Sequence, residues 1–117
     1  MPTVRVFVYG SLKRGFVHHA LLDGAEREGP AETAPGYRLV LQGSYPALVP
    51  GRGGSVRGEL YRVSAELLCR LDAFEGCPEL YQRSEVLLAD GSTALCYAID
   101  EDRARDCPEL DADEWWP

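Results

Sequence analysis

Only one long stretch of this 117-residue chain has strong helical character, and that limits the folds open to it. The segment SAELLCRLDAFEG, residues 64–76, starts with Ser64 in an N-cap position and continues with good helix formers. It ends at Gly76, a residue typical of helix C-termini. A shorter stretch, residues 17–22, has room for one or two helical turns before Gly24. The sequence therefore predicts a domain in which strands outnumber helices.

Short runs typical of β-strands fill most of the remaining chain. Residues 4–9 (VRVFVY) are β-branched and aromatic, and they predict a central strand. Residues 25–35 are mixed and bounded by proline. Further strands are expected in 37–43, at the start of 45–54, in 55–63, and twice in 82–100 around the turn signal Asp90-Gly91. Because the connections are short, we expect an α+β fold: a small, mostly antiparallel mixed sheet or barrel with one main helix.

The acidic charge of the chain is concentrated at its C-terminal end. Residues 100–117 carry eight of the 19 acidic residues and two of the 12 basic ones, within a net charge of −7. The length fits a single domain, and a composition with 45% hydrophobic residues is typical of globular proteins. We therefore predict one domain, residues 1–99, followed by an acidic C-terminal tail, residues 100–117, that is solvated. The pair Trp115-Trp116 is the one hint that the tail docks on something.

Several classes of partner are not expected. The chain lacks the basic face that binding to nucleic acid requires. Its first residues contain too short an apolar run for a signal peptide, and no stretch approaches membrane-spanning length, so a cytoplasmic protein without a membrane partner is expected. The four cysteines form no C-x-x-C motif and no histidine has metal-ligand spacing, so neither a metal nor another cofactor is predicted. The oligomeric state is left open.

The predicted helix places a carboxylate on its apolar side. With about 100° between successive residues, Leu67, Leu68, Leu71 and Phe74 form one stripe, and Glu75 falls within it. A carboxylate on this side is either paired with a cation or positioned for proton transfer, for which a raised pKa is useful. The alternative is that Glu75, at the helix end, turns out to water beside Gly76. Periodicity alone leaves these interpretations open.

The loop GSLKRG, residues 10–15, follows the first predicted strand. Its G-x-x-x-x-G skeleton resembles a phosphate loop, but Phe16-Val17 stand where a Lys and a Ser or Thr are required. A hydrolase based on Ser11 is disfavoured because the surroundings are not G-x-S-x-G and no acid is assigned to orient His18 or His19. Two interpretations remain, an ordinary turn and a loop whose N–H groups hold a carboxylate or an oxyanion.

Taken together, Y-G-S-L-K-R-G (9–15) and L-D-A-F-E-G-C-P-E-L-Y-Q-R (71–83) resemble the γ-glutamylcyclotransferase family. The second stretch is most similar to γ-glutamylamine cyclotransferases and, more loosely, to the plant AIG2-like proteins. The resemblance runs from about residue 4 to residue 99 and includes Y-P-A-L-V (45–49) and G-E-L-Y (58–61). A lone YGSL is a weak signal, whereas its pairing with F-E-x-C-P-x-L-Y-x-R is specific.

The resemblance implies an enzyme without metal or cofactor that acts on a small γ-glutamyl substrate. The α-amino group of the γ-glutamyl unit attacks its own γ-carbonyl, which yields 5-oxoproline and a free amine. By the family match, Glu75 is the general base. The substrate-binding residues implied are Tyr9, Gly10, Ser11 and Leu12, with Tyr45 and Tyr81 as further candidates.

Position 12 departs from the glutathione-degrading branches of the family, which often carry Asn after Y-G-S where this chain has Leu12. The departure favours a γ-glutamylamine, such as γ-glutamyl-ε-lysine, over glutathione or a free γ-glutamyl amino acid. The alternative function is a non-catalytic module of the same fold that binds a small molecule or a partner. The identity of the leaving amine is not predicted.

Overall fold

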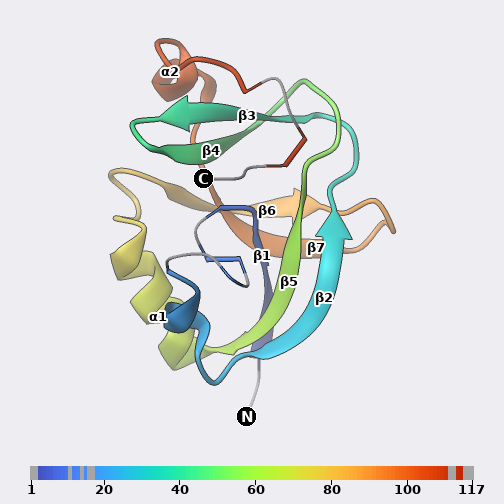
Figure 1. Cartoon of the computed structure of the whole chain (residues 1–117), viewed down its shortest axis with the longest axis vertical. Coiled ribbons are helices and arrows are strands. Elements are labelled where there is room, and N and C mark those ends of the chain that lie inside the picture. The colour runs from blue at the N-terminus through green and yellow to red at the C-terminus, as the bar shows by residue number, and fades with distance from the viewer. Residues whose placement is uncertain (1–2, 11, 14, 16–17, 111–112, 115–117) are drawn as a thin grey trace.

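The computed structural model describes residues 3–10, 12–13, 15, 18–110 and 113–114. Ser11 and the pair Trp115-Trp116, which the sequence singled out, lie outside the described residues. Seven strands and one main helix make up most of the described chain (Figure 1). In chain order the elements are β1 (Thr3–Val8), the 3-10 turn η1 (His19–Leu22), β2 (Glu26–Glu32), β3 (Tyr37–Gln42), β4 (Tyr45–Pro50), β5 (Arg57–Ser64), α1 (Ala65–Phe74), β6 (Gln82–Leu87), β7 (Thr93–Ala98) and α2 (Glu101–Ala104).

The strands form one mixed sheet that does not close into a barrel. Its order is β2-β5-β1-β7-β4-β3, and β6 pairs with β7 off this path. The pairs are antiparallel, as expected, except where β7 runs parallel to β1 and to β4. The first of these parallel contacts joins Val6 to Leu95, and the second joins Leu48 to Ala98. Strands β1 and β4 therefore meet β7 at different points along its length, and they diverge from each other (Figure 1).

Strand β1 is central and contributes to hydrophobic clusters on both of its faces. Val6 and Val8 pack with the helix residues Leu67 and Leu71, whereas Phe7 belongs to the cluster built with β3, β4 and β7. This alternation follows from the two-residue period of a strand. Both faces of β1 are covered, as the run VRVFVY predicted.

Helix α1 begins and ends close to the predicted positions. The Ser64 hydroxyl accepts a hydrogen bond from the Leu67 N–H at 3.1 Å and caps the first turn. The last helical residue is Phe74, Glu75 is the C-cap, and Gly76 follows with φ of 65°. A side chain at Gly76 would be strained by this φ, and its Cβ would lie only 2.8 Å from Leu80 Cδ1. Gly76 therefore ends the helix for a steric reason.

The apolar stripe of α1 is narrower than the sequence predicted. Leu67 and Leu71 are buried and Leu68 is half-buried, but Phe74 is 39% exposed, so its assignment to the core was wrong. Phe74 lies on the last turn, where the helix runs past the body of the sheet and its side chain meets His18 instead. Helical periodicity gives the direction of a side chain, but it does not show where the neighbouring layer stops.

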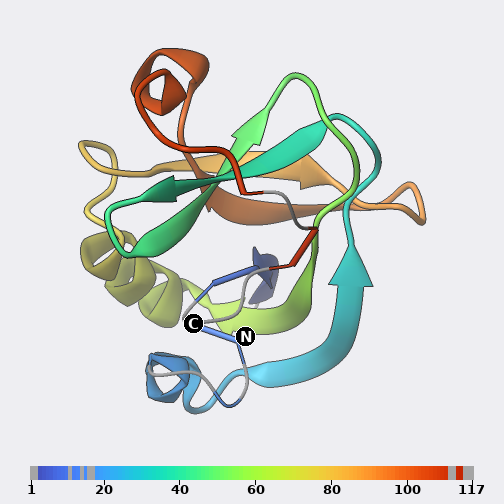
Figure 2. The same cartoon turned by 45° about the horizontal axis from the view of Figure 1, so that its top comes forward.

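The described part of the acidic tail packs against the domain. Asp100 caps α2 by accepting a hydrogen bond from the Arg103 N–H at 2.8 Å, and Ala104 is buried against the hairpin β3–β4. The backbone then follows β3, where the Leu41 N–H donates to the Pro108 carbonyl at 2.8 Å. Figure 2 shows this segment, in red, running from α2 across the hairpin. Residues 100–110 therefore pack against the domain through their backbone and Ala104, although most of their side chains remain exposed as expected, and the domain boundary at residue 99 stays a prediction.

Basic side chains of the domain hold the acidic residues of the tail. Arg38 pairs with Glu101 at 2.7 Å and with Glu109 at 2.8 Å. Further along, Lys13, which is 2% exposed, pairs with Glu114 at 3.3 Å. The sequence did not reveal these ion pairs, because the basic partners of the acidic run are scattered through the chain. Only folding brings them together. None of the helices described here is long and apolar enough to cross a membrane.

Candidate active site

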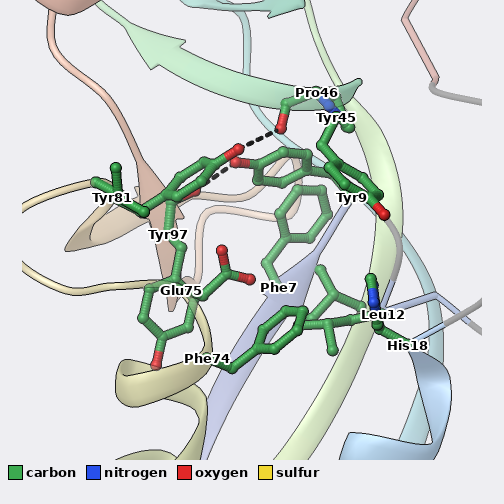
Figure 3. Close-up of a pocket in the computed structure, with 13 residues that line it drawn as sticks. Phe7, Tyr9, Leu12, His18, Tyr45, Pro46, Phe74, Glu75, Tyr81 and Tyr97 are labelled. Atoms are coloured by element: carbon green, nitrogen blue, oxygen red, sulfur yellow. Dashed lines mark hydrogen bonds between the residues drawn. The ribbon is translucent and has the colours of Figure 1, made fainter. Parts of the chain in front are cut away.

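A pocket of about 380 Å³ lies at the point where β1, β4 and β7 diverge, and the end of α1 lies at its side (Figure 3). Aromatic and aliphatic side chains supply most of its wall. The residues that line it are Phe7, Val8, Tyr9, Gly10, Leu12, His18, Tyr45, Pro46, Phe74, Glu75, Leu80, Tyr81 and Tyr97. Every described residue that the sequence predicted for the site is among them. The pocket therefore unites two motifs that are far apart in the chain.

The loop after β1 forms one side of the pocket as a tight turn. The Lys13 N–H donates to the Gly10 carbonyl at 3.0 Å and closes the turn. A Cβ placed on Gly10 would lie 3.1 Å from Pro46 Cγ, which is closer than an ordinary contact. Gly10 thus lets the turn rest against the start of β4. Leu12 is buried on the side of the helix cluster and also lines the pocket.

Glu75 brings the one acidic side chain of the described lining into the pocket. Figure 3 shows its carboxylate extending from the end of α1 toward the middle of the labelled side chains, with Phe7 and Tyr9 beyond it. Burial raises the pKa of Glu75 from its ordinary 4.5 to about 7. Within the described residues, no hydrogen bond or ion pair to this carboxylate offsets that effect. Near neutral pH such a group can both accept and return a proton.

Tyr9 uses its hydroxyl to join three strands. The hydroxyl donates a hydrogen bond to the Tyr97 carbonyl of β7 and accepts one from the Leu48 N–H of β4 at 3.0 Å. Burial, followed by the nearby Tyr81, keeps the pKa of Tyr9 well above its ordinary value of 10. The Tyr9 ring lines the pocket, but its hydroxyl proton is already committed to backbone. Tyr9 is therefore a structural part of the wall.

The hydroxyls of two further tyrosines are also engaged in hydrogen bonds. Tyr81 donates to the Pro46 carbonyl at 3.0 Å, and burial together with the Glu75 charge raises its pKa to about 12. Tyr97 donates to Asp72 Oδ1 at 2.6 Å, and the other oxygen of Asp72 pairs with Arg83 at 2.6 Å. These bonds fasten β4, β6 and the helix around the pocket, so its shape is set before any ligand enters.

The mouth of the pocket is formed by a second group of side chains, which we call the rim: His18, Tyr45, Phe74 and Leu80. The His18 ring packs edge-on against Phe74 with centroids 4.9 Å apart, and it lies 5.8 Å from the Tyr45 ring. Tyr45, Phe74 and Leu80 are 42%, 39% and 55% exposed. Apolar groups at the opening of a cavity are thus left in contact with solvent.

Sequence reasoning missed part of this lining. Phe7 and Tyr97 had no assigned role, although Phe7 lies two residues before Tyr9 and the period of a strand puts both on one face. His18 was considered only as a partner for Ser11. His19 is turned elsewhere, with Nδ1 3.0 Å from the Leu12 carbonyl oxygen and its ring beside Tyr61. No local sequence pattern shows that β7 pairs with both β1 and β4. The sequence therefore could not place Tyr97 in the pocket.

No candidate metal centre occurs in the described ranges, where no three His, Cys, Asp or Glu side chains are grouped as ligands. The four cysteines are all free thiols, and burial raises the pKa of Cys96 to about 12. The chemical capacity of the pocket therefore rests on the Glu75 carboxylate and on the backbone of the turn at Gly10 and Leu12.

Fold and pocket define a small α+β protein with an aromatic-walled pocket around a carboxylate. The family model described as "Gamma-glutamyl cyclotransferase, AIG2-like" matches residues 6–117. The chain is 46% identical over 93 residues to gamma-glutamylaminecyclotransferase from Bos taurus, covering 72% of this chain and 55% of that protein. It is 45% identical over 97 residues to gamma-glutamylaminecyclotransferase C from Danio rerio, covering 75% of this chain and 64% of that protein.

Among solved structures, the chain is similar to the crystal structure of an AIG2-like protein from Mus musculus. The TM-score is 0.83 at 30% sequence identity, with 99% of this chain and 90% of that chain covered. The protein therefore belongs to the γ-glutamyl cyclotransferase, AIG2-like family, as its motifs indicated. It spans less than two thirds of the length of the bovine and zebrafish relatives.

Proposed function

We propose that this protein is a cyclotransferase that cleaves a γ-glutamylamine, such as γ-glutamyl-ε-lysine, into 5-oxoproline and a free amine. The observation that carries the proposal is the half-buried Glu75, whose pKa is raised to about 7, in the same pocket as the turn at Gly10 and Leu12. The family of the chain and the names of its bovine and zebrafish relatives support this choice of reaction.

In the proposed reaction Glu75 acts as the base. Its ionised carboxylate takes a proton from the α-ammonium of the γ-glutamyl unit, and the freed amine nitrogen attacks the γ-carbonyl carbon of the same unit. A carbon–nitrogen bond forms and closes a five-membered ring. The bond to the departing amine then breaks, and the proton held by Glu75 passes to that nitrogen. The reaction consumes no water and needs no covalent intermediate with the enzyme.

A pKa of about 7 suits this role. An α-amino group ordinarily has a pKa of about 8, so a base of pKa about 4.5 would take its proton poorly. Burial strengthens Glu75 as a base while leaving it largely ionised just above neutral pH. The apolar wall and the rigid turn would then hold the γ-glutamyl chain in a folded conformation, which is where an intramolecular closure gains much of its rate.

The turn after β1 is proposed to hold the γ-glutamyl end. In this proposal the backbone N–H groups of Gly10 and Leu12 face the α-carboxylate of the substrate or the oxyanion that forms at the γ-carbonyl. Ser11, which lies outside the described residues, stays a candidate from the sequence. Tyr9, Tyr45 and Tyr81 contribute ring surface to the site, since the hydroxyls of Tyr9 and Tyr81 are engaged with backbone.

The test is release of 5-oxoproline from γ-glutamyl-ε-lysine by the purified protein and by the Glu75→Gln variant. The amide cannot take up the proton, so we expect kcat to fall by about 10²–10⁴-fold. Glu66→Gln is the matched control, because Glu66 is exposed on the same helix and lies outside the pocket. Full activity of Glu75→Gln would refute the assignment of the base. Ligand-induced thermal stabilisation without turnover would favour a non-catalytic binding module.

The pH dependence of the reaction tests the same assignment. The base must be ionised, so we expect kcat/KM to rise about tenfold per pH unit below pH 7 and to level off between about pH 7 and 8, where the α-ammonium of the substrate begins to lose its proton. The measurement is kcat/KM between pH 5 and 9 with Glu66→Gln alongside, which should give the same curve. A profile that is already flat at pH 5.5 would contradict a base of raised pKa.

A further inference from the structure

Lys13 closes the turn after β1, and its side chain is a buried cation that the proposed reaction does not use. It is 2% exposed and lies outside the lining of the pocket, although Gly10 and Leu12 of the same turn belong to that lining. Its N–H donates to the Gly10 carbonyl at 3.0 Å. A charged side chain loses its hydration when it is buried, and this loss is tolerated where an opposite charge is close. The groups that pair with Lys13 therefore bear on the shape of the turn.

One partner of Lys13 comes from the far end of the chain. Glu114 Oε2 lies 3.3 Å from Lys13 Nζ, and the Glu114 side chain is itself only 24% exposed. Figure 2 shows residues 113–114, in red, beside the turn after β1, in blue. An ion pair that is largely withdrawn from solvent is screened by salt much less than a surface pair. The contact thus joins the acidic tail to the turn that borders the pocket.

The same tail segment is fixed on its other side by the start of β5. The Asp113 carbonyl accepts a hydrogen bond from the Arg57 N–H at 2.8 Å, and the Asp113 carboxylate lies 3.1 Å from the Arg57 guanidinium. Glu114 is 3.8 Å from the same guanidinium. The next residue, Gly58, lies so close to the end of β1 that a Cβ there would collide with the Val8 carbonyl. Residues 113–114 therefore span from β5 to the turn.

Loss of the Glu114 charge would act on the pocket through the backbone. The Lys13 ammonium would then gain from moving toward water, because its burial would be less well compensated. Such a movement pulls on the N–H that closes the turn on Gly10. Because Gly10 and Leu12 border the pocket, the turn would shift against the substrate. A misplacement of about 1 Å can lower the rate of an enzyme about 100-fold.

We propose that Glu114 is a positioning residue of the active site, which holds the turn from Gly10 to Lys13 in its active conformation by pairing with Lys13. This inference rests on the proposed function, in which the turn holds the γ-glutamyl end of the substrate. Glu114 is not among the residues that line the pocket, and it acts through Lys13. The C-terminal segment then contributes to the construction of the site, although it lies outside the motifs that identify the family.

The first test compares Glu114→Gln with Asp113→Asn in the release of 5-oxoproline from γ-glutamyl-ε-lysine. All assays are run at a temperature at which circular dichroism shows each variant to be folded. Glu114→Gln should lower kcat/KM by at least about tenfold. Asp113→Asn is the matched control, because it removes a neighbouring carboxylate whose ion pair with Arg57 is about half exposed, and its kcat/KM should stay within about twofold. A Glu114→Gln variant as active as wild type would overturn the proposal.

A double variant tests whether Glu114 acts through Lys13. Lys13→Met/Glu114→Gln removes both charges, so no uncompensated ammonium is left in the buried position. Removing both members of a buried ion pair costs much less than removing one, and we expect kcat/KM to return to within about threefold of wild type. This rescue is not expected if Glu114 only contributes to global stability. A double variant as slow as Glu114→Gln would overturn the assignment.

Amide hydrogen exchange follows the turn independently of catalysis. Protection of the Lys13 N–H should fall by at least about tenfold in Glu114→Gln and stay unchanged in Asp113→Asn. If the wild-type protein releases no 5-oxoproline but this protection falls, Glu114 still positions the turn and the proposed function fails. If the wild-type protein is active and the protection is the same in Glu114→Gln, the proposed function stands and the role of Glu114 is overturned.

Discussion

The interior of the pocket and its rim are both aromatic, but their side chains are held in different ways. In the interior, the hydroxyls of Tyr9 and Tyr81 bond to backbone carbonyls and that of Tyr97 bonds to Asp72, and together they join β1, β4, β7 and α1. At the rim, the rings of Tyr45 and Phe74 each lie against the ring of His18, and both residues remain substantially exposed. The interior therefore belongs to the architecture of the fold, whereas the rim presents exposed ring surface at the mouth of the pocket.

The strongest test of this contrast compares Tyr9→Phe with Tyr45→Phe. Tyr9→Phe leaves the Tyr97 carbonyl and the Leu48 N–H without their buried partner, so we expect a loss of about 2–4 kcal/mol in the free energy of unfolding. Tyr45→Phe changes a side chain that is 42% exposed, and its cost should stay below about 1 kcal/mol. Urea denaturation of both variants at pH 7 gives the comparison. Equal losses would remove the distinction between interior and rim.

Glu75 makes the interior sensitive to pH. Its pKa is raised in the folded protein, so the folded state binds a proton more tightly than the unfolded state does, and stability falls as pH rises from about 4.5 to about 7. For a half-buried carboxylate we expect a loss of about 1–3 kcal/mol over this range. Glu75→Gln should abolish the loss, and we expect it to be more stable than wild type at pH 8 even though its kcat should be much lower.

Denaturant unfolding at pH 5 and pH 8 measures this effect, with Glu66→Gln as the control that keeps the wild-type dependence. A Glu75→Gln variant whose stability changes with pH as much as wild type would show that another group is responsible. With the expected outcome, the burial that raises the pKa of Glu75 also lowers the stability of the folded protein near neutral pH.

An effect of intermediate size should come from Tyr81→Phe. The change removes one hydrogen bond, to the Pro46 carbonyl at 3.0 Å, near the boundary between interior and rim. We expect a loss of about 1 kcal/mol in the free energy of unfolding, between the values for Tyr9→Phe and Tyr45→Phe. The same urea titration measures it. A loss as large as that of Tyr9→Phe would show that the single bond of Tyr81 contributes as much as the two bonds of Tyr9.

Much of the site was accessible from sequence because two of its parts are local. The run that ends at Tyr9 predicts a central strand with a loop after it, and the helix from Ser64 to Gly76 predicts the angular position of Glu75. Both predictions depend on hydrogen bonds and periods that span only a few residues. The family resemblance then associated the two motifs, and the structure brings Tyr9, Gly10, Leu12 and Glu75 into one pocket.

Other features could not be predicted in this way. Phe74 was assigned to the core, because periodicity does not reveal that the last turn of α1 runs past the sheet. The tail was expected to be solvated, because a run of acids does not show that Arg38 will meet Glu101 and Glu109. The parallel contacts of β7 with β1 and β4 carry no turn signal, since those strands are far apart in the chain.

The sequence by itself thus determined most of the strands, the main helix with its two ends and the carboxylate on its apolar side, since each depends on interactions between near neighbours in the chain. It did not predict β2 or α2. Only the tertiary structure decided which hydroxyls are bound and which rings are exposed. Those outcomes depend on where β1 and β4 diverge beside β7, which brings the Leu48 N–H and the Tyr97 carbonyl to the Tyr9 hydroxyl and leaves Tyr45 and Phe74 at the opening. A pairing between distant strands is chosen by the packing of the whole domain, and no short segment contains it.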